Sequence, residues 1–169
     1  MIPRVVHQLW IGPHPRPAAW MATWPRLNPG WRYELWDNAR TAAFGFRNAG
    51  QIAAIPAWSG KCDLMRYEIL ARHGGLFFDA DEECLRPLGD ELRAHDSWAC
   101  WENEHVRPGL LGCGALGAVP GCALMERCVE ACARRDVTSG PAWQTVGPSL
   151  LTEVAATYPA LHVYPSWTF

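Results

Sequence analysis

The pair Gly74–Gly75 separates a helical pattern from a short aromatic run that ends in two carboxylates. Adjacent glycines end a helix, and the run Leu76–Asp79 is typical of a short buried strand. Residues two apart on an extended segment point to the same side. If the extended geometry continues through Ala80, Asp79 and Asp81 therefore converge on one point.

Two carboxylates at the end of a buried strand are unfavourable unless a positive charge lies between them. Mg²⁺ and Mn²⁺ prefer oxygen ligands and keep open positions for substrate phosphates. The placement of Asp79 and Asp81 after a glycine pair and a strand therefore predicts a divalent-metal site that receives a phosphate-bearing substrate.

Strand and helix patterns alternate along the whole chain, which predicts a single α/β domain over residues 1–169 with a mostly parallel sheet. Ligands of such sheets bind beyond the carboxyl ends of the strands. The expected strands are Val5–Trp10, Trp31–Trp36, Leu76–Asp79, Trp98–Glu102, Gly112–Val119 and Leu161–Tyr164. The expected helices are Pro17–Leu27, a helix capped by Asp37-Asn38 that runs to Phe46, Ser59–His73, Cys122–Arg134 and Pro148–Ala156.

Composition excludes several classes of protein. The net charge of −2 provides no broad basic surface for non-specific binding to nucleic acids. No apolar run approaches the roughly 20 residues that span a bilayer, and the first residues lack the pattern of a signal peptide. We therefore expect a cytoplasmic protein, with peripheral action at a membrane left open.

The seven cysteines contain no Cys-x-x-Cys pair, so reduced core residues are favoured over a zinc site. The ten tryptophans are expected mostly in the core. One or two of them could stack on a base or a sugar ring.

Asp63 and Arg66 lie three residues apart on the helix before the glycine pair, so they share a helix face. Taken alone, they are typical of a solvated surface ion pair. Together with the paired aspartates they suggest a nucleotide-sugar site. A carboxylate can bind sugar hydroxyls, and a guanidinium can bind sugar or phosphate oxygens in bidentate fashion.

The combined pattern resembles the family 32 glycosyltransferases with a DXD sugar-binding motif. This group includes capsular polysaccharide enzymes and enzymes like the yeast initiating mannosyltransferase, and large clostridial glucosylating toxins share its site design. The segments that carry the resemblance are Ile2–Gly12, Asn28–Asp37, Lys61–Leu70, Gly74–Asp81, Cys84–Leu88 and Val146–Thr152.

The resemblance implies a GT-A fold, a Rossmann-like nucleotide-diphospho-sugar transferase domain. It implies an enzyme that moves a hexose from a UDP- or GDP-linked sugar, with retention of configuration and with Mn²⁺ or Mg²⁺ as cofactor. The implied roles are catalytic for Asp63, Arg66, Asp79 and Asp81, donor-binding for Trp10, Trp36, Asp63, Arg66 and Asp79, and metal-binding for Asp81 and Asp79.

Some roles stay open in the sequence. Core packing is as good an interpretation of Trp36 as base binding, and His7 is better explained as a structural strand residue than as a ligand. Glu82, Glu83, Glu102 and Glu104 are candidates for the acceptor side, although a solvated loop explains each of them better. No general base is assigned.

The acceptor is unidentified: a glycan, a lipid-linked sugar, a protein or a modified nucleic acid. One alternative is a catalytically degenerate or partner-dependent nucleotide-sugar binding module. A phosphatase with a nucleophilic aspartate is disfavoured because Glu82 and Glu83 follow the aspartates.

The chain departs from the family pattern at several points. Cys62 replaces a common serine, and Phe77 or Phe78 replaces a common tyrosine. Residues 113–120 lack an expected asparagine. The C-terminus is expected to be short, and His162 is only a minor candidate for a late metal ligand.

Overall fold

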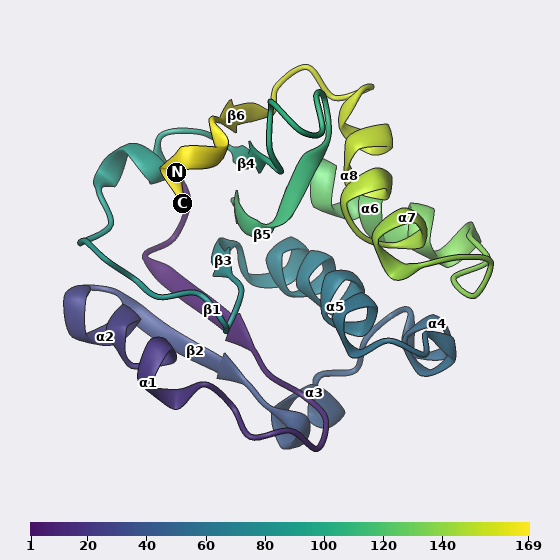
Figure 1. Cartoon of the computed structure of the whole chain (residues 1–169), viewed down its shortest axis with the longest axis horizontal. Coiled ribbons are helices and arrows are strands. Elements are labelled where there is room, and N and C mark those ends of the chain that lie inside the picture. Colours follow the sequence, from purple (N-terminus) through teal and green to yellow (C-terminus); the bar gives the residue numbers. More distant parts are fainter.

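A six-stranded sheet with the order β2-β1-β3-β5-β4-β6 forms the centre of the molecule in the computed structural model, which describes all residues 1–169 (Figure 1). The strands are β1 (Val5–Leu9), β2 (Arg32–Trp36), β3 (Gly75–Phe78), β4 (Ser97–Trp101), β5 (Leu111–Ala118) and β6 (His162–Tyr164). All six expected strands are present, each within one or two residues of its expected bounds.

Only β5 runs against the other strands. β1 pairs in parallel with β2 and β3, and β4 pairs in parallel with β6. β5 is antiparallel to both of its neighbours, β3 and β4. The prediction of a mostly parallel sheet is therefore confirmed, and the carboxyl ends of β1, β2 and β3 lie at one edge.

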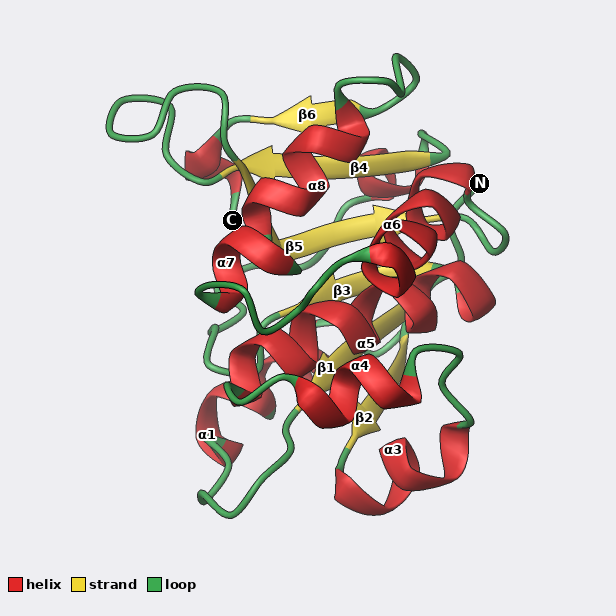
Figure 2. Cartoon of the chain, turned by 90° about the vertical axis from the view of Figure 1, so that its right-hand side faces the viewer, coloured by secondary structure: helices red, strands yellow, loops and turns green.

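Helices cover one face of the sheet more fully than the other. Figures 1 and 2 show α5, α6 and α8 along one face, with α1 and α2 on the other side near β2. The α-helices are α1 (Ala18–Met21), α2 (Thr23–Leu27), α3 (Asn38–Phe44), α4 (Ala49–Ala54), α5 (Trp58–His73), α6 (Ala123–Arg134), α7 (Ala142–Thr145) and α8 (Pro148–Ala155). Two 3₁₀ turns span Asp90–Arg93 and Ser166–Thr168.

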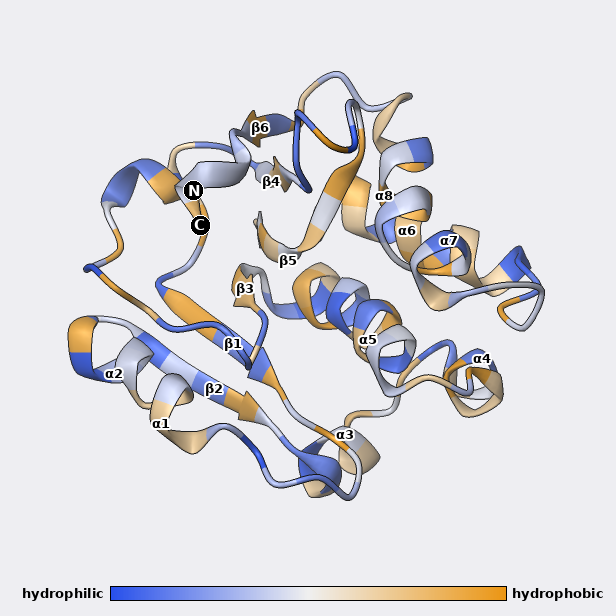
Figure 3. Cartoon of the chain, in the orientation of Figure 1, coloured by the Kyte–Doolittle hydropathy of each residue, from blue (hydrophilic) through white to orange (hydrophobic).

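Alternate strand residues supply two cores, one on each face of the sheet. Phe77 belongs to the larger core under α5, α6 and α8, whereas Leu76 and Phe78 belong to a smaller core with Trp24 and Trp98. In Figure 3 hydrophobic colour covers much of β1 and β5, the edge strands β2 and β6 are more hydrophilic, and the helices are banded with hydrophobic and hydrophilic residues. The sheet is therefore buried on both faces, as a mostly parallel sheet requires.

The ends of two helices agree with the sequence analysis. The Asp37 carboxylate accepts a hydrogen bond from Arg40 N and caps α3, and Gly74 follows the last residue of α5 with φ +61°. Gly75 has a further role, because a Cβ there would lie 2.9 Å from His7 Nε2. The glycine pair thus ends a helix and also admits a buried histidine.

Other local predictions were wrong. The expected helix Pro17–Leu27 is two short helices, α1 and α2, and Ser59 does not cap α5, which begins at Trp58. Neither α4 nor α7 was predicted. These segments are only four to six residues long, too short for a helical period to stand out in the sequence.

All seven cysteines are free, and six of them are buried, as expected of reduced core residues. None of the helices has the length and apolar character that a membrane crossing requires. The cellular location stays a prediction.

Candidate functional site

Five of the six predicted site residues line one cavity of about 280 Å³, which we call the carboxylate cavity. It lies beyond the carboxyl ends of β1 and β3, beside the first half of α5. Trp10 follows β1, Asp63 and Arg66 come from α5, and Asp79 and Asp81 follow β3. The sequence motifs, although up to 71 residues apart, therefore meet at a single site.

The two aspartates reach this cavity through a turn. β3 ends at Phe78, and the Glu82 N–H donates to the Asp79 carbonyl at 3.2 Å. The extended geometry does not continue through Ala80, so the condition set in the sequence analysis is not met, and the two aspartates reach the same cavity through the turn instead. The Gln8 side chain also donates to the Asp79 carbonyl at 2.9 Å, so β1 holds the turn in place.

Arg66 is the central charge of the site and is only 3% exposed. Its Nη2 lies 2.5 Å from Asp79 Oδ1 and 3.6 Å from Asp63 Oδ1, and its guanidinium carbon lies 4.7 Å from the centre of the Phe77 ring. The alternative of a solvated surface ion pair is excluded. Burial lowers the pKa of Arg66, but the two aspartates outweigh burial and raise it.

Not all nitrogens of the Arg66 guanidinium form hydrogen bonds. Its Nε and Nη1 are buried and have no partner. Buried N–H groups are almost always satisfied, and an unsatisfied one costs about 1–3 kcal/mol. Arg66 itself lines the carboxylate cavity, so the site contains a guanidinium with two unsatisfied nitrogens.

Asp63 is held close to the α7–α8 turn. The position that a Cβ would occupy at Gly147 lies 2.7 Å from Asp63 Oδ2, so only glycine leaves room for the carboxylate. Burial raises the pKa of Asp63 to about 6, while Arg66 acts in the opposite direction. The carboxylate is thus predominantly ionised at neutral pH.

Glu82 is half-buried, and its interpretation as a solvated loop residue was wrong. The position of a Cβ at Gly114 would lie 3.0 Å from Glu82 Oε1 and 3.2 Å from Asp79 Oδ2, so both carboxylates approach the same glycine. Burial, followed by the charge of Asp79, raises the pKa of Glu82 to about 8. No signal near Glu82 in the sequence predicted this, because Gly114 is distant along the chain.

The acidic side chains fit a divalent cation in charge and donor type. Burial first, and then the charges of Asp79 and Asp81, raise the pKa of Glu82, and a cation would offset these negative charges. The structure contains no set of three His, Cys, Asp or Glu side chains arranged to hold a metal. A cation here would therefore depend on substrate phosphates and water for its remaining ligands, as Mg²⁺ commonly does.

The two tryptophans predicted at the donor site lie in different surroundings. Trp10 lines the carboxylate cavity, and its Nε1 donates to the His14 carbonyl. Trp36 is 2% exposed, and its Nε1 donates to His7 Nδ1, so its assignment to the donor site is corrected to core packing. This hydrogen bond also gives His7 the structural role that the sequence favoured.

His162 lies away from the site. It stacks on His95 with the ring centres 3.9 Å apart, and it belongs to the edge strand β6. His162 is therefore excluded as a metal ligand of the carboxylate cavity.

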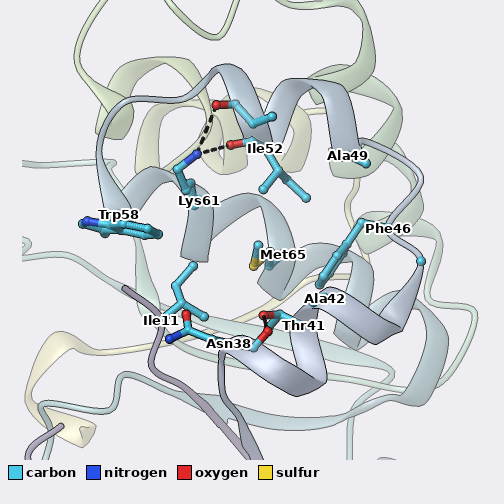
Figure 4. A pocket seen from close by; sticks show the side chains of 12 residues that line it. Ile11, Asn38, Thr41, Ala42, Phe46, Ala49, Ile52, Trp58, Lys61 and Met65 are labelled. Carbon is cyan, nitrogen blue, oxygen red and sulfur yellow. Dashed lines mark hydrogen bonds between the residues drawn. The ribbon is translucent and has the colours of Figure 1, made fainter. Parts of the chain in front are cut away.

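A larger apolar cavity of about 360 Å³ adjoins the carboxylate cavity, with Ile11 and Trp58 lining both. It lies between α3, α4 and α5, and Figure 4 shows Lys61 turned toward backbone oxygens, with Nζ 2.6 Å from the Ile52 carbonyl. Because its one cation is engaged and it contains no carboxylate, the charged chemistry belongs to the smaller cavity.

Comparison with known proteins agrees with this geometry. The family model described as "Glycosyltransferase sugar-binding region containing DXD motif" matches residues 18–99. This range contains Asp63, Arg66, Asp79 and Asp81.

Two named relatives extend the likeness. "Uncharacterized glycosyltransferase L373" of Acanthamoeba polyphaga mimivirus is 29% identical over 129 residues, which cover 71% of this chain and 51% of that protein. "Inositol phosphoceramide mannosyltransferase 1" of Schizosaccharomyces pombe is 33% identical over 97 residues, which cover 52% of this chain and 30% of that protein. The chain thus spans about half the length of the viral relative and less of the yeast one.

A solved structure, "PaToxG Glycosyltransferase", superposes with a TM-score of 0.75 at 12% sequence identity, covering 94% of this chain and 70% of that one. At this identity the likeness concerns the fold alone. The GT-A prediction is confirmed.

Proposed function

We propose that the chain transfers a hexose from a nucleoside-diphosphate sugar to an acceptor hydroxyl, because residues 18–99 match the family model of the glycosyltransferase sugar-binding region with a DXD motif. The transfer retains the anomeric configuration and depends on Mn²⁺ or Mg²⁺. The observation that carries this proposal is the buried Arg66 with two unpartnered nitrogens, in a cavity that also holds Asp63, Asp79 and Asp81.

Asp63 and Arg66 bind the donor sugar. The free N–H groups of Arg66 donate to sugar or phosphate oxygens, and the Asp63 carboxylate accepts hydrogen bonds from sugar hydroxyls. Because Arg66 is already held by Asp79, its guanidinium is oriented before the donor arrives. Such preorganisation lowers the barrier, since little reorganisation is needed during the reaction.

Asp79 and Asp81 face the donor diphosphate. A divalent cation held by these two carboxylates would supply charge stabilisation for the departing diphosphate. Arg66 orients the Asp79 carboxylate, and Gln8 holds its backbone. Trp10 lies beside the nucleoside and provides an aromatic surface for the base.

The transfer needs no protein nucleophile. The bond between the anomeric carbon and the diphosphate oxygen breaks, and its electron pair leaves with the phosphate. The acceptor hydroxyl attacks from the leaving-group side, its oxygen bonds to the anomeric carbon, and its proton passes to a phosphate oxygen. This path preserves the configuration and explains why no general base is assigned.

The names of the fission yeast relatives support a hexose donor, mannose included. Because these names do not specify the nucleotide, both UDP- and GDP-linked sugars should be tested as donors.

A nucleotide-sugar binding module without turnover is the second candidate. The two candidates share donor binding and differ in metal-dependent turnover.

Thermal unfolding with a panel of UDP- and GDP-sugars, with and without Mn²⁺, tests donor binding, because a ligand that binds the folded state raises the melting temperature. We expect a Mn²⁺-dependent shift with one donor, lost in Asp81→Asn and kept in Asp96→Asn, an exposed aspartate just before β4. No shift with any donor contradicts both candidates. A shift without donor hydrolysis or transfer favours the binding module.

A further inference from the structure

The proposed function leaves the apolar cavity of about 360 Å³ unused. Its volume falls within the range of roughly 300–1,000 Å³ that is typical of ligand pockets. Helices α3, α4 and α5 form its walls together with Ile11, and Figure 4 shows Phe46, Ile52 and Met65 among the side chains that line it. Most of its lining residues are hydrophobic, and no carboxylate is among them. The cavity therefore has the size of a ligand site and offers mainly apolar contacts.

The polar side chains of the apolar cavity already have partners in the backbone. Gly12 N donates to Asn38 Oδ1 at 2.9 Å, and Asn38 Nδ2 donates to the Gly12 carbonyl at 3.3 Å. Thr41 Oγ1 donates to a carbonyl of the preceding turn at 2.8 Å, and Lys61 Nζ donates to two carbonyls of α4. Figure 4 shows the indole nitrogen of Trp58 on the side away from the other lining residues. Because a polar group taken from water needs a new partner, this cavity favours a hydrocarbon group over a nucleobase or a sugar.

Helix α5 carries the two cavities on neighbouring faces. Asp63 and Arg66 line the carboxylate cavity, whereas Lys61 and Met65 line the apolar cavity. Residues three or four apart lie on one face of a helix, so each pair extends a row along α5. Trp58, at the start of the helix, lines both cavities. The space for the donor and the apolar space therefore lie side by side.

Trp58 and Ile11 form the wall that the two cavities share. The Trp58 ring rests on the backbone of Gly12, which has φ +97° and where a Cβ would lie 2.9 Å from Trp58 Cε2. The indole is nevertheless 46% exposed, whereas large aromatic side chains are usually buried. An exposed indole that is held against the chain gives this wall a fixed apolar surface.

The two cavities suit different substrates. A nucleoside-diphosphate sugar presents hydrogen-bonding groups on its base, its phosphates and its sugar, and the carboxylate cavity supplies charged partners for such groups. No part of such a donor is a hydrocarbon chain. A chain in the apolar cavity therefore belongs to the other substrate, the acceptor.

We propose that the apolar cavity binds the hydrocarbon chain of an amphiphilic acceptor, whose hydroxyl-bearing headgroup passes over Ile11 and Trp58 to the donor in the carboxylate cavity. The inference rests on the proposed function, because it takes the carboxylate cavity as the donor site. It identifies the acceptor class as lipid-like molecules that carry hydroxyl groups next to an alkyl or acyl chain.

Isothermal titration calorimetry with methyl, n-butyl and n-octyl β-D-glucopyranoside, each below its micelle concentration, tests the apolar cavity. Burial of one methylene tightens binding by up to about four-fold, so the octyl compound should bind at least ~10-fold more tightly than the butyl compound. Ala42→Phe fills the cavity from α3 and should abolish this gain. Ala43→Phe is the matched control and should keep it, because Ala43 is the next residue of α3, is also exposed and does not line the cavity.

Ala49→Phe repeats the test from the α4 wall and guards against a folding defect in Ala42→Phe. Equal affinity of the wild type for the butyl and octyl compounds would overturn the proposal. So would a gain that survives in both filled variants, because the chain would then bind elsewhere, as a detergent does on any apolar surface. Loss of the gain in Ala43→Phe would also overturn it, because the effect would not be local to the cavity.

Melting shifts with nucleotide sugars on the same samples separate this failure from failure of the proposed function. If a donor still shifts the melting temperature of every variant but chain length has no effect, the acceptor inference fails and donor binding stands. If chain length matters but no donor shifts the melting temperature, the cavity binds a chain, and its assignment to an acceptor fails together with the proposed function.

Discussion

His7 and Arg66 are buried polar side chains near opposite ends of β3, and they differ in whether all of their nitrogens have hydrogen-bond partners. At its start, His7 is 1% exposed and both ring nitrogens are engaged: Nε2–H donates to the Gly74 carbonyl, and Nδ1 accepts from Trp36. Beyond its end, Arg66 is 3% exposed and bonds Asp79 through Nη2, but its Nε and Nη1 have no partner.

This difference distinguishes a side chain that stabilises the fold from one that is available to a ligand. A buried group that is fully satisfied contributes to stability, because every partner is inside the chain. A buried group with unpartnered donors lowers the stability of the free protein. Such a group is retained where a bound ligand supplies the missing hydrogen bonds. The β3 ends therefore predict opposite consequences of mutation: altered stability at His7 and lost function at Arg66.

The largest effect is expected for Arg66→Gln. The variant loses the guanidinium fork that orients Asp79 and receives the donor, so we expect transfer or donor hydrolysis to fall ~100- to 1,000-fold, the range for removal of one preorganised donor. Steady-state kinetics measures this loss. Arg72→Gln, on the exposed side of the same helix, is the control, and equal activity in both variants would refute the assignment.

The next effect concerns acid stability at His7. Burial lowers the pKa of His7 from 6.5 to about 4, so the folded state holds the neutral ring, whose Nδ1 must accept from Trp36. The stability due to neutral His7 is fully present above pH 6.5 and is lost as the pH falls through about 4. We expect a loss of about 3 kcal/mol across this window.

Chemical denaturation of wild type and His7→Phe, followed from pH 7 to pH 4, isolates this contribution. The variant should be less stable at pH 7, and its difference from wild type should shrink toward pH 4. His105→Phe, at an exposed loop histidine, should follow the wild type. A constant difference between His7→Phe and wild type would show that His7 does not titrate in this range.

Glu82 should show the opposite dependence of stability on pH. Burial raises the pKa of Glu82 to about 8, so its contribution to stability is present below the unfolded value near 4.5 and is lost as the pH rises through about 8. Without metal, we expect Glu82→Gln to be more stable than wild type at pH 9 by roughly 1 kcal/mol, after allowance for solvent screening, and equal to it near pH 4.5.

Denaturation with EDTA and then with Mn²⁺ measures this effect. The advantage of Glu82→Gln should shrink with Mn²⁺, because the cation offsets the repulsion among the carboxylates. Glu83→Gln, at the exposed neighbour, is the control. If the free energy of unfolding depended on pH equally in wild type and Glu82→Gln, Glu82 would be a solvated residue.

The smallest effect is expected for Cys62→Ser. Cys62 lines the carboxylate cavity, and burial raises the pKa of its thiol to about 12, so it is a neutral weak donor. Serine is similar in size and restores a hydroxyl, so donor affinity should change by less than about ten-fold, the value of one hydrogen bond. Titration with the donor measures this, and a larger loss would make Cys62 a specific contact.

Local pattern predicted the elements of this fold well where they are long or strongly marked. Apolar runs, and alternation in the case of β2, located all six strands. Asp37 was predicted to cap α3 and Gly74 to end α5, and both do so. The short helices α4 and α7 escaped prediction. The turn at Asp79–Glu82 was also missed, because it depends on Gln8, which is more than 70 residues away.

The same division holds inside the site. Residue type and order in the sequence determined the candidates Asp63, Arg66, Asp79 and Asp81, because a helix face and a strand end are local features.

Only the tertiary structure decided which polar groups are buried and which of them are satisfied. Trp36 is buried in the core, Glu82 is half-buried against Gly114, Asp63 lies against Gly147, and two nitrogens of Arg66 have no hydrogen-bond partner. The physical reason is that burial and hydrogen-bond satisfaction depend on neighbours from distant segments, whose distances no local pattern encodes.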